Sequence, residues 1–412
     1  MDLTDNGLNI CKIKVIGVGG AGNNAVNRII DLNISSAQFV SVNTDKQALL
    51  LSKAPYENRI QIGEVLTKGL GAGSDPEMGE KAAEESKEAI EEAVKGVDLL
   101  FIAAGMGGGT GTGAAPVIAR IAKEAGCITV AVVTKPFAFE GRRREENAKR
   151  GIANLSKYVD TIVIIPNDKL LEALPNDISM IDALKVADDT LRQGICGIAD
   201  LISTPAMINL DFADVRTIIK NQGLAHMGVG RAKGEHRVVE AVRQAVSSPL
   251  LETTIEGARG VIINVTGGKD LTLGQVYEAA RLVQGVVDYS ANIIFGADIN
   301  ESLQEEIEIT VIATGFATKS LNGDDGGVRK NFANLMKDDR DAKPKQPQQE
   351  VRPVRPENYQ VRNERPESEQ YRREIPKVAQ PVEYESEEEV FAANQTPKKE
   401  LPSFMKKLFG KK

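Results

Sequence analysis

The sequence predicts an α/β protein: a mostly parallel sheet with helices on both faces, then a long helix, a second mixed-sheet α/β domain and a disordered C-terminal tail. Up to about Thr318, apolar runs of strand length alternate with amphipathic runs of helical length. Two glycine-rich turns each stand between an apolar run and a helical run. Beyond Thr318 the chain is rich in Pro, Gln, Glu, Arg and Asn.

The first domain is expected at residues 12–177, after a flexible N-terminus at residues 1–11. Its expected strands are Lys12–Ile16, Gln38–Val42, Val97–Ala103, Ile128–Val133 and Thr161–Ile165. Its expected helices are Asn24–Ile30, Pro76–Val94, Ala114–Glu124 and Arg142–Leu155. Because strand and helix alternate throughout, this region favours a parallel sheet that is covered on both faces.

A long helix is expected at residues 178–203, as a spine between two domains. Its apolar residues recur at helical spacing; they are Ile181, Leu184, Ala187, Leu191, Ile195 and Ile198. The second domain is expected at residues 204–317. Its expected elements are the helices Glu235–Ser247 and Leu273–Val286 and the strands Gly260–Thr266, Ile293–Ala297 and Glu308–Ala313. This order fits a mixed α/β sheet.

The tail divides into a linker at residues 318–399 and a terminal peptide at residues 400–412. The linker composition cannot bury enough apolar surface to offset the entropy of ordering, which predicts disorder. In the peptide, Leu401, Phe404, Met405 and Leu408 follow an i, i+3, i+4, i+7 spacing. One apolar face on so short a helix indicates a segment that orders in a partner's groove, with a frayed terminus as the alternative.

Bulk composition narrows the class of protein. The 412-residue chain has a formal net charge of −7, which argues against nucleic acid as the main partner. Its three cysteines, Cys11, Cys127 and Cys196, are scattered and predict reduced structural thiols, with no metal site. We see neither a signal peptide nor an apolar run of the ~18 residues that span a bilayer. We therefore expect a cytoplasmic protein that reaches a membrane only through a peripheral segment or a partner.

The first glycine-rich turn, Gly17–Gly22, reads G-V-G-G-A-G between an expected strand and an expected helix. Glycines let the backbone approach a phosphate, and the helix N-terminus offers free N–H groups. Asp45, after the second expected strand, occupies the place of the ribose-binding acid of dinucleotide-binding folds. On this turn alone, an NAD-dependent oxidoreductase and a purely structural turn both remain open.

The second glycine-rich turn, Gly105–Gly113, has six glycines in nine residues. A structural turn needs one or two, so this backbone is expected to wrap around a ligand, with Thr110 and Thr112 as hydroxyl donors. Two phosphate cradles on neighbouring strands suit a triphosphate better than a pyrophosphate. The sequence contains no G-x-x-x-x-G-K-[ST] motif, which excludes a P-loop NTPase.

These motifs resemble those of the tubulin/FtsZ family of GTPases, and in particular its FtsZ members. The segment Gly107–Gly113 resembles the family's signature loop, and Gly69–Pro76 resembles the loop that contacts the γ-phosphate. The resemblance covers about Lys12–Phe316 and the terminal peptide, and it implies a tubulin-like nucleotide-binding domain. The residues expected to contact the nucleotide in these loops are Gly19, Gly20, Ala21, Gly22, Asn23, Asn24, Asp45, Ala72, Gly73, Gly107, Gly108, Gly109, Thr110, Gly111, Thr112 and Gly113.

The resemblance also assigns residues to the base and the ribose. Guanine presents N1–H and N2–H₂ donors, which a carboxylate reads well. Asp188 on the long helix matches the family's base-reading aspartate, and Asn167 matches its asparagine partner. Glu140 and Arg144 match the residues that hold the ribose and a nearby phosphate. Leu184 stands where the family often has an aromatic residue, so it can cover the base without stacking on it.

Catalysis is assigned to Asn209, Asp211 and Asp214, in a segment that resembles the family's synergy loop. In that family, the acidic residues of one subunit enter the nucleotide pocket of the next. Asp211 and Asp214 would orient and polarise the attacking water, with Asn209 assisting. Their spacing is equally typical of a helix N-cap, and both interpretations can hold together.

The resemblance thus implies a GTPase that binds GTP and GDP with Mg²⁺ and polymerises with itself head to tail. It also implies a division ring at midcell, with membrane-anchoring and regulatory division proteins binding residues 401–412. Two other classes stay open on the residues alone: a nucleotide-cofactor oxidoreductase, and a scaffold that polymerises without hydrolysis. Within the family, a plasmid-segregating or cell-shape relative is a further alternative.

Overall fold

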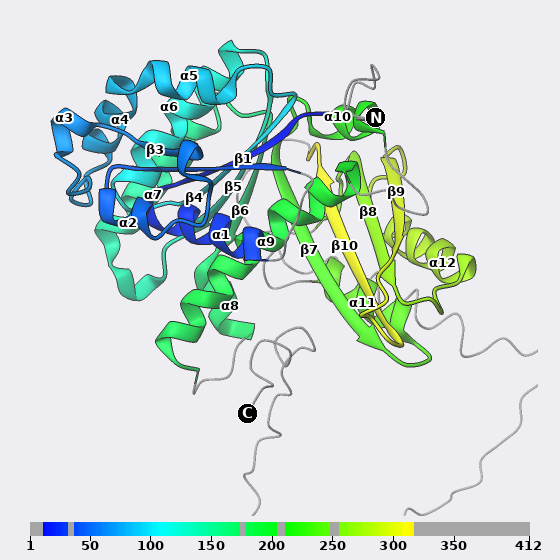
Figure 1. Ribbon diagram of the computed structural model, residues 1–412. Coiled ribbons are helices and arrows are strands. Elements are labelled where there is room, and N and C mark those ends of the chain that lie inside the picture. Colours follow the sequence, from blue (N-terminus) through cyan, green and yellow to red (C-terminus); the bar gives the residue numbers. More distant parts are fainter. Residues whose placement is uncertain (1–10, 32–36, 174–177, 204–210, 248–254, 317–412) are drawn as a thin grey trace, which may run out of the picture. The chain divides into compact units, whose positions relative to one another are not determined.

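The computed structural model describes residues 11–31, 37–173, 178–203, 211–247 and 255–316 (Figure 1). Their strands form one ten-stranded sheet in the order β3-β2-β1-β4-β5-β6-β7-β10-β8-β9. Four predictions lie outside the described residues: the flexible N-terminus up to residue 10, the linker at 318–399, the terminal peptide at 400–412 and the role of Asn209. No helix among the described residues is long and apolar enough to cross a bilayer.

The first six strands pair in parallel, which confirms the predicted parallel sheet. They are β1 (Ile13–Val18), β2 (Gln38–Asn43), β3 (Arg59–Gln61), β4 (Leu99–Gly105), β5 (Ile128–Lys135) and β6 (Thr161–Pro166). In β1, Ile13 and Val15 face one apolar core while Ile16 and Val18 face another. This alternation is what buries a parallel strand on both sides.

Helices cover both faces of this half of the sheet (Figure 1). One face is covered by α1 (Gly19–Asp31) and the long helix α9 (Met180–Ser203). The other face is covered by α4 (Pro76–Glu85), α5 (Lys87–Val94), α6 (Thr110–Glu124) and α7 (Arg142–Leu155). The central strands β1, β4 and β5 are therefore buried on both faces, as the alternation of strand and helix predicts.

The remaining strands form the mixed half of the sheet: β7 (Gly223–Lys233), β8 (Gly260–Gly267), β9 (Asn292–Ile299) and β10 (Glu306–Thr314). Strand β7 joins the two halves, because its first residues pair in parallel with β6 and the others pair antiparallel with β10. Helices α11 (Arg237–Val246) and α12 (Leu273–Gln284) cover a separate core on this half, and α10 (Phe212–Ile219) precedes β7. The predicted mixed second domain is confirmed.

Several predicted boundaries are wrong. The single helix expected at Pro76–Val94 is two helices, since the backbone of Ser86 leaves the helical region and its hydroxyl accepts a hydrogen bond from the Gly63 N–H at 3.1 Å. Four short elements were missed because they are too brief to show a period; they are β3, α2 (Lys46–Leu50), α3 (Glu64–Thr67) and α8 (Asn167–Ala173). The helix start expected at Asp211 is confirmed by α10, although Asp211 makes no side-chain cap bond. Helices α1 and α6 begin inside the glycine turns, at Gly19 and Thr110, rather than after them.

Candidate nucleotide site

The two glycine loops lie against each other at the carboxyl ends of β1 and β4. These strands are parallel neighbours, with Val18 opposite Ala104. A Cβ added to Gly19 would lie 2.9 Å from the Gly111 nitrogen, and one added to Gly105 would lie 2.7 Å from the Ala21 side chain. The loops therefore pack backbone to backbone, at a separation that side chains would prevent. The structure brings both predicted cradles together, and they sit where parallel α/β sheets bind ligands.

Each loop also presents backbone to open space. A Cβ at Gly20 or Gly108 would meet no atom within 4 Å. Gly20 lies in the first turn of α1, and Gly108 lies just before α6 begins at Thr110. Unpaired N–H groups and the positive end of the helix dipole make such a terminus a site for anions. Two termini side by side are suited to neighbouring phosphates of one ligand.

A buried hydrogen-bond chain behind the first loop fixes its shape. Asn23 Nδ2 donates to the Gly17 carbonyl at 3.0 Å, and Asn43 Nδ2 donates to Asn23 Oδ1 at 2.7 Å. Thr44 and Thr110 hydroxyls lie 2.7 Å apart and link the end of β2 to the second loop. Asn43 and Thr44 were missed in the sequence analysis. Their place directly after a strand, beside two glycine loops in a parallel sheet, was the signal that could have found them.

Thr112 has a different place from the one expected. Its side chain is buried, and its hydroxyl accepts a hydrogen bond from the Gly107 N–H at 2.9 Å. The Thr112 hydroxyl thus braces the second loop from inside, whereas Thr110 is partly exposed. A phosphate contact of Thr112 stays a prediction.

The third loop, Gly69–Pro76, folds onto the second. Gly109 has no room for a Cβ, which would lie 2.8 Å from the Ala72 side chain. Gly73 and Ser74 both have positive φ, at 59° and 62°, and Asp75 caps α4 by accepting from the Glu77 N–H at 3.0 Å. The loop is therefore held in a tight curve against the second glycine loop, and its γ-phosphate contact stays a prediction.

Asp45 serves the fold directly. One carboxylate oxygen accepts from the Gln47 and Ala48 N–H groups, at 2.8 and 3.3 Å, and so caps α2. This capping role accounts for the acid at the end of β2 without a ribose. A nucleotide contact of Asp45 stays a prediction.

The expected base-reading groups lie on α8 and α9. Asn167 opens α8, and its Oδ1 atom is buried with no hydrogen-bond partner among the described residues. Such an orphaned acceptor indicates a missing donor, as a base amino group would supply. Asp188 is largely buried on α9, and burial raises the pKa of its carboxyl to about 6. Leu184, one turn earlier on α9, is 43% exposed and can cover an apolar ligand surface.

Glu140 and Arg144 form an ion pair with each other at the start of α7. The second carboxylate oxygen of Glu140 accepts from the Phe137 N–H at 2.9 Å. The pair is thus oriented by its own loop, with the guanidinium 46% exposed. An exposed, oriented guanidinium is suited to a phosphate or a ribose oxygen.

The acidic pair lies at the other end of the sheet. Helix α10 ends beside the start of β6, where the Thr161 hydroxyl donates a hydrogen bond to the Ile219 carbonyl. The glycine loops follow the opposite, carboxyl ends of β1 and β4. Asp211 and Asp214 are both exposed, and Asp211 stands at the N-cap of α10 without making a side-chain cap bond. The structure therefore does not bring these acids together with the glycine loops of the same chain.

The described residues contain no group of three His, Cys, Asp or Glu side chains placed to hold a metal ion. The polar groups are instead a concentration of backbone N–H groups, the exposed guanidinium of Arg144, the largely buried carboxylate of Asp188 and the buried amide oxygen of Asn167. This chemistry fits a nucleoside triphosphate whose base offers N–H donors.

Comparison with known proteins agrees with this geometry. Residues 12–175 match the "Tubulin/FtsZ family, GTPase domain" and residues 223–317 match the "FtsZ family, C-terminal domain". An FtsZ dimer from M. jannaschii is 44% identical over 76% of this chain and 94% of its own, with a TM-score of 0.72. A point mutant of the same organism's FtsZ is 46% identical over 74% and 92%, with a TM-score of 0.72.

A more distant likeness is that to GDP-bound CetZ1 from Haloferax volcanii, at 22% identity over 80% of this chain and 99% of its own, with a TM-score of 0.66. At that identity the likeness shows the fold alone. The two domain matches and the identity to FtsZ over nearly the whole of its length show more: the chain belongs to the tubulin/FtsZ family of GTPases, in its FtsZ branch.

Proposed function

We propose that this GTPase hydrolyses GTP at head-to-tail contacts between its own copies, with Asp211 and Asp214 of one copy completing the pocket of the next. The observation that carries the proposal is the placement of the acids at the end of the sheet opposite the glycine loops. In a head-to-tail arrangement the same placement sets the acids of one copy against the loops of its neighbour. A contact of this kind does not close and generates a filament.

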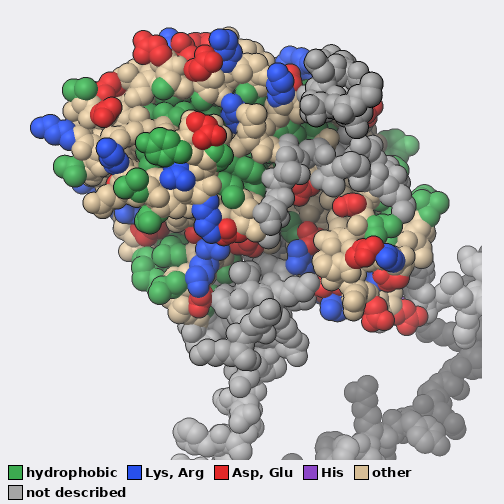
Figure 2. All heavy atoms as spheres, viewed as in Figure 1, with side chains coloured by type: hydrophobic (Ala, Val, Ile, Leu, Met, Phe, Trp, Pro, Cys, Tyr) green, Lys and Arg blue, Asp and Glu red, His purple; other side chains and the backbone are tan. Residues whose placement is uncertain are grey.

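Exposed apolar side chains beside the third loop support a contact surface at the loop end. Figure 2 shows hydrophobic side chains on the face that carries α2 and α3. The exposed apolar residues in this stretch are Leu50, Leu51, Val65, Leu66 and Leu70. A group of this kind marks an interaction surface more often than a free one. The M. jannaschii relative, an FtsZ dimer, is consistent with self-association.

The nucleotide in the proposal is GTP. Asp188 accepts the N1–H and N2–H₂ donors of guanine and the orphaned Asn167 Oδ1 accepts a further donor, while the glycine loops hold the phosphates. Mg²⁺ would be held mainly by phosphate oxygens and would neutralise the charge that develops on the transferred group. The acids from the next copy, with Asn209, would orient the attacking water.

The cellular role follows from the family resemblance. We propose filaments that turn over as GTP is hydrolysed, in the cytoplasm, as a division ring at midcell. The peptide at residues 401–412 would bind membrane-anchoring and regulatory division proteins through its apolar face.

Phosphate release from GTP and Mg²⁺, per molecule of protein, over a dilution series tests the proposal. We expect almost no release below a threshold concentration and a steep rise above it. Asp214→Ala should lower the rate above threshold by at least about 100-fold, as loss of a group that activates water does. Glu240→Ala, which removes an exposed acid on α11, is the matched control and should leave the rate unchanged.

If the rate per molecule did not change with dilution, the protein would still be a GTPase, but its active site would not be shared between copies. Filaments without phosphate release at any concentration would favour the scaffold alternative.

A further inference from the structure

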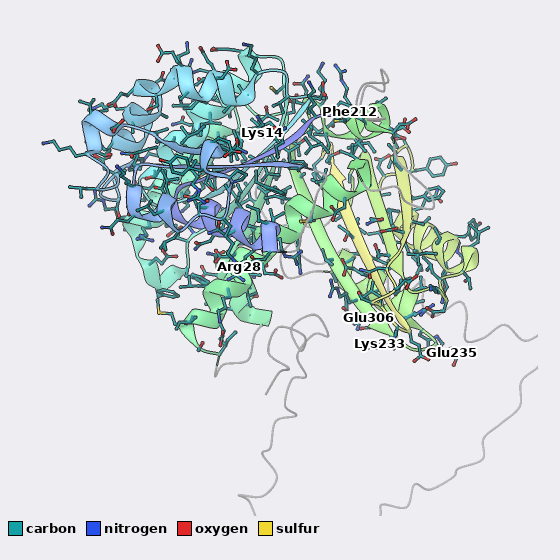
Figure 3. The ribbon with its side chains drawn as sticks, in the orientation of Figure 1. Lys14, Arg28, Phe212, Lys233, Glu235 and Glu306 are labelled. Atoms are coloured by element: carbon teal, nitrogen blue, oxygen red, sulfur yellow. The ribbon has the colours of Figure 1, made fainter. Side chains whose placement is uncertain are left out.

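Arg28, on α1, is the cation nearest to the expected base-reading carboxylate. Its Nε atom lies 3.5 Å from Asp188 Oδ2, and the two side chains are 29% and 16% exposed. Figure 3 marks Arg28 on α1, which packs against α9. The two residues are 160 positions apart in the chain, so helix packing alone brings them together.

The contact is incomplete from both sides. Arg28 Nε is buried and makes no hydrogen bond among the described residues, although Asp188 Oδ2 lies 3.5 Å away. Burial raises the pKa of the Asp188 carboxyl to about 6, and Arg28 acts against that rise. A charged pair in such surroundings tightens readily when a ligand excludes the remaining water.

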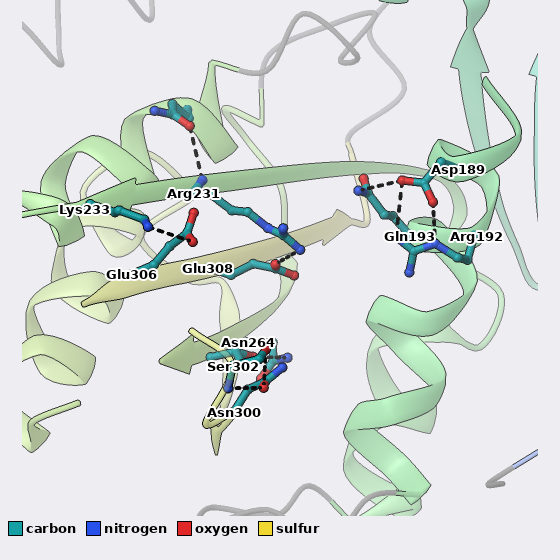
Figure 4. A network of polar contacts seen from close by, with 12 residues as sticks. Asp189, Arg192, Gln193, Arg231, Lys233, Asn264, Asn300, Ser302, Glu306 and Glu308 are labelled. Atoms are coloured by element: carbon teal, nitrogen blue, oxygen red, sulfur yellow. Dashed lines mark hydrogen bonds and ion pairs between the residues drawn. The ribbon is translucent and has the colours of Figure 1, made fainter. Parts of the chain in front are cut away.

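Among the charged side chains that the structure describes, Arg28 is the cation that acts on Asp188. The neighbouring Asp189 is held by Arg192 and Gln193 on the same helix (Figure 4), and as a like charge it raises the pKa of Asp188 further. On α9 itself and on the elements packed against it, the other charged groups have the following places. Asp31 pairs with Lys53, Lys169 with Glu172 and Lys185 with Asp182; Asp168 accepts from the Ala138 N–H, and Lys135 ends β5.

We propose that Arg28 is a positioning residue for guanine: it holds the Asp188 carboxylate ionised and turned toward the base, and so sets the preference for GTP. An ionised carboxylate offers both oxygens to the N1–H and N2–H₂ donors, whereas a protonated one has exchanged an acceptor for a donor. One Asp188 oxygen has lone pairs enough for Arg28 and the base together. This inference rests on the proposed GTP binding and deepens it.

The test compares binding of GTP and ITP, whose base lacks the 2-amino group, across pH 6 to 8.5. Arg28→Gln is expected to weaken GTP binding about 10-fold or more near pH 6.5 and to shrink the preference for GTP over ITP. Because loss of Arg28 raises the pKa of Asp188, the defect should diminish as the pH rises and the carboxyl ionises. Arg28→Lys should restore much of the preference for GTP over ITP. As a control, Lys53→Gln removes the ion pair of Asp31, which lies on α1 like Arg28, and should change neither affinity.

A merely structural role would give a loss that is equal for GTP and ITP and independent of pH, and that result would overturn the inference. A carboxyl ¹³C NMR titration of Asp188 without nucleotide separates this failure from that of the proposed function. If the wild-type protein failed to bind GTP, the proposed function would fall. Even then, the role proposed for Arg28 requires the midpoint of the Asp188 titration to lie at higher pH in Arg28→Gln than in the wild-type protein. An unchanged midpoint would be enough to refute that role.

Discussion

The two ends of the parallel sheet differ in how completely one chain builds them. At the carboxyl end, three loops pack backbone to backbone, and buried amides and hydroxyls fix their shapes. At the amino end, Asp211 and Asp214 are exposed, and Asp211 makes no side-chain cap bond. One chain therefore builds all three loops of the proposed phosphate site, while its acids lie at the opposite end of the sheet. A shared active site would require this arrangement, with the loops at one end of the sheet and exposed acids at the other.

The strongest test of a shared active site inactivates the two ends of the sheet on different copies. Asp214→Ala copies keep the GTP pocket, whereas Asp188→Asn copies keep the acids and present an amide that suits xanthine rather than guanine. With GTP and XTP together, neither variant alone should hydrolyse GTP. An equal mixture should recover about a quarter of the wild-type rate, since random head-to-tail order pairs the intact halves that often.

Release of labelled phosphate from GTP measures this recovery, and sedimentation shows whether the copies assemble together. Co-assembly without recovered GTP hydrolysis would place the whole active site on one copy.

Two adjacent glycines of the first loop, Gly19 and Gly20, test the packing at the carboxyl end of the sheet. Gly19→Ala is expected to lower the free energy of unfolding by about 2–4 kcal/mol, because Gly19 has a φ of 72° and its Cβ would press on the Gly111 nitrogen. Gly20→Ala should change stability by less than about 1 kcal/mol, since its Cβ meets open space. The same methyl group should nevertheless weaken GTP binding, because it enters the space proposed for phosphate.

Denaturant unfolding without nucleotide and direct GTP titration separate the two effects. Equal destabilisation by both substitutions would contradict the packing described for the loops.

The smallest expected effect concerns the base. Leu184→Phe should strengthen GTP binding by about 0.5–1.5 kcal/mol, roughly 2- to 12-fold, because a ring can stack on guanine where Leu only covers it. Leu184→Met, which changes shape without adding a ring, serves as the control. Unchanged GTP affinity in Leu184→Phe would show that this part of α9 does not contact the base.

Much of the site could be predicted because its signals are local in the chain. Glycine spacing, the strand before each loop and the helix after it are all visible within about fifteen residues. Strand β7 was not predicted, because its own sequence holds three glycines and few β-branched residues and so gives no local strand signal. The fold explains two of them, since Cβ atoms at Gly228 and Gly230 would collide with α11 backbone at 1.8 and 1.9 Å.

The sequence by itself therefore determined the glycine loops and the parallel order of the first domain, because each depends on short-range pattern, whereas the guanine-reading candidates came from the family resemblance. Only the tertiary structure decided that β7 joins both halves into one sheet, that Thr112 braces its own loop and that Asp211 and Asp214 lie at the end of the sheet opposite the glycine loops. The tertiary structure alone also placed Arg28 next to Asp188. These features depend on which distant surfaces pack together, and packing is settled by the shape of whole elements rather than by residue spacing.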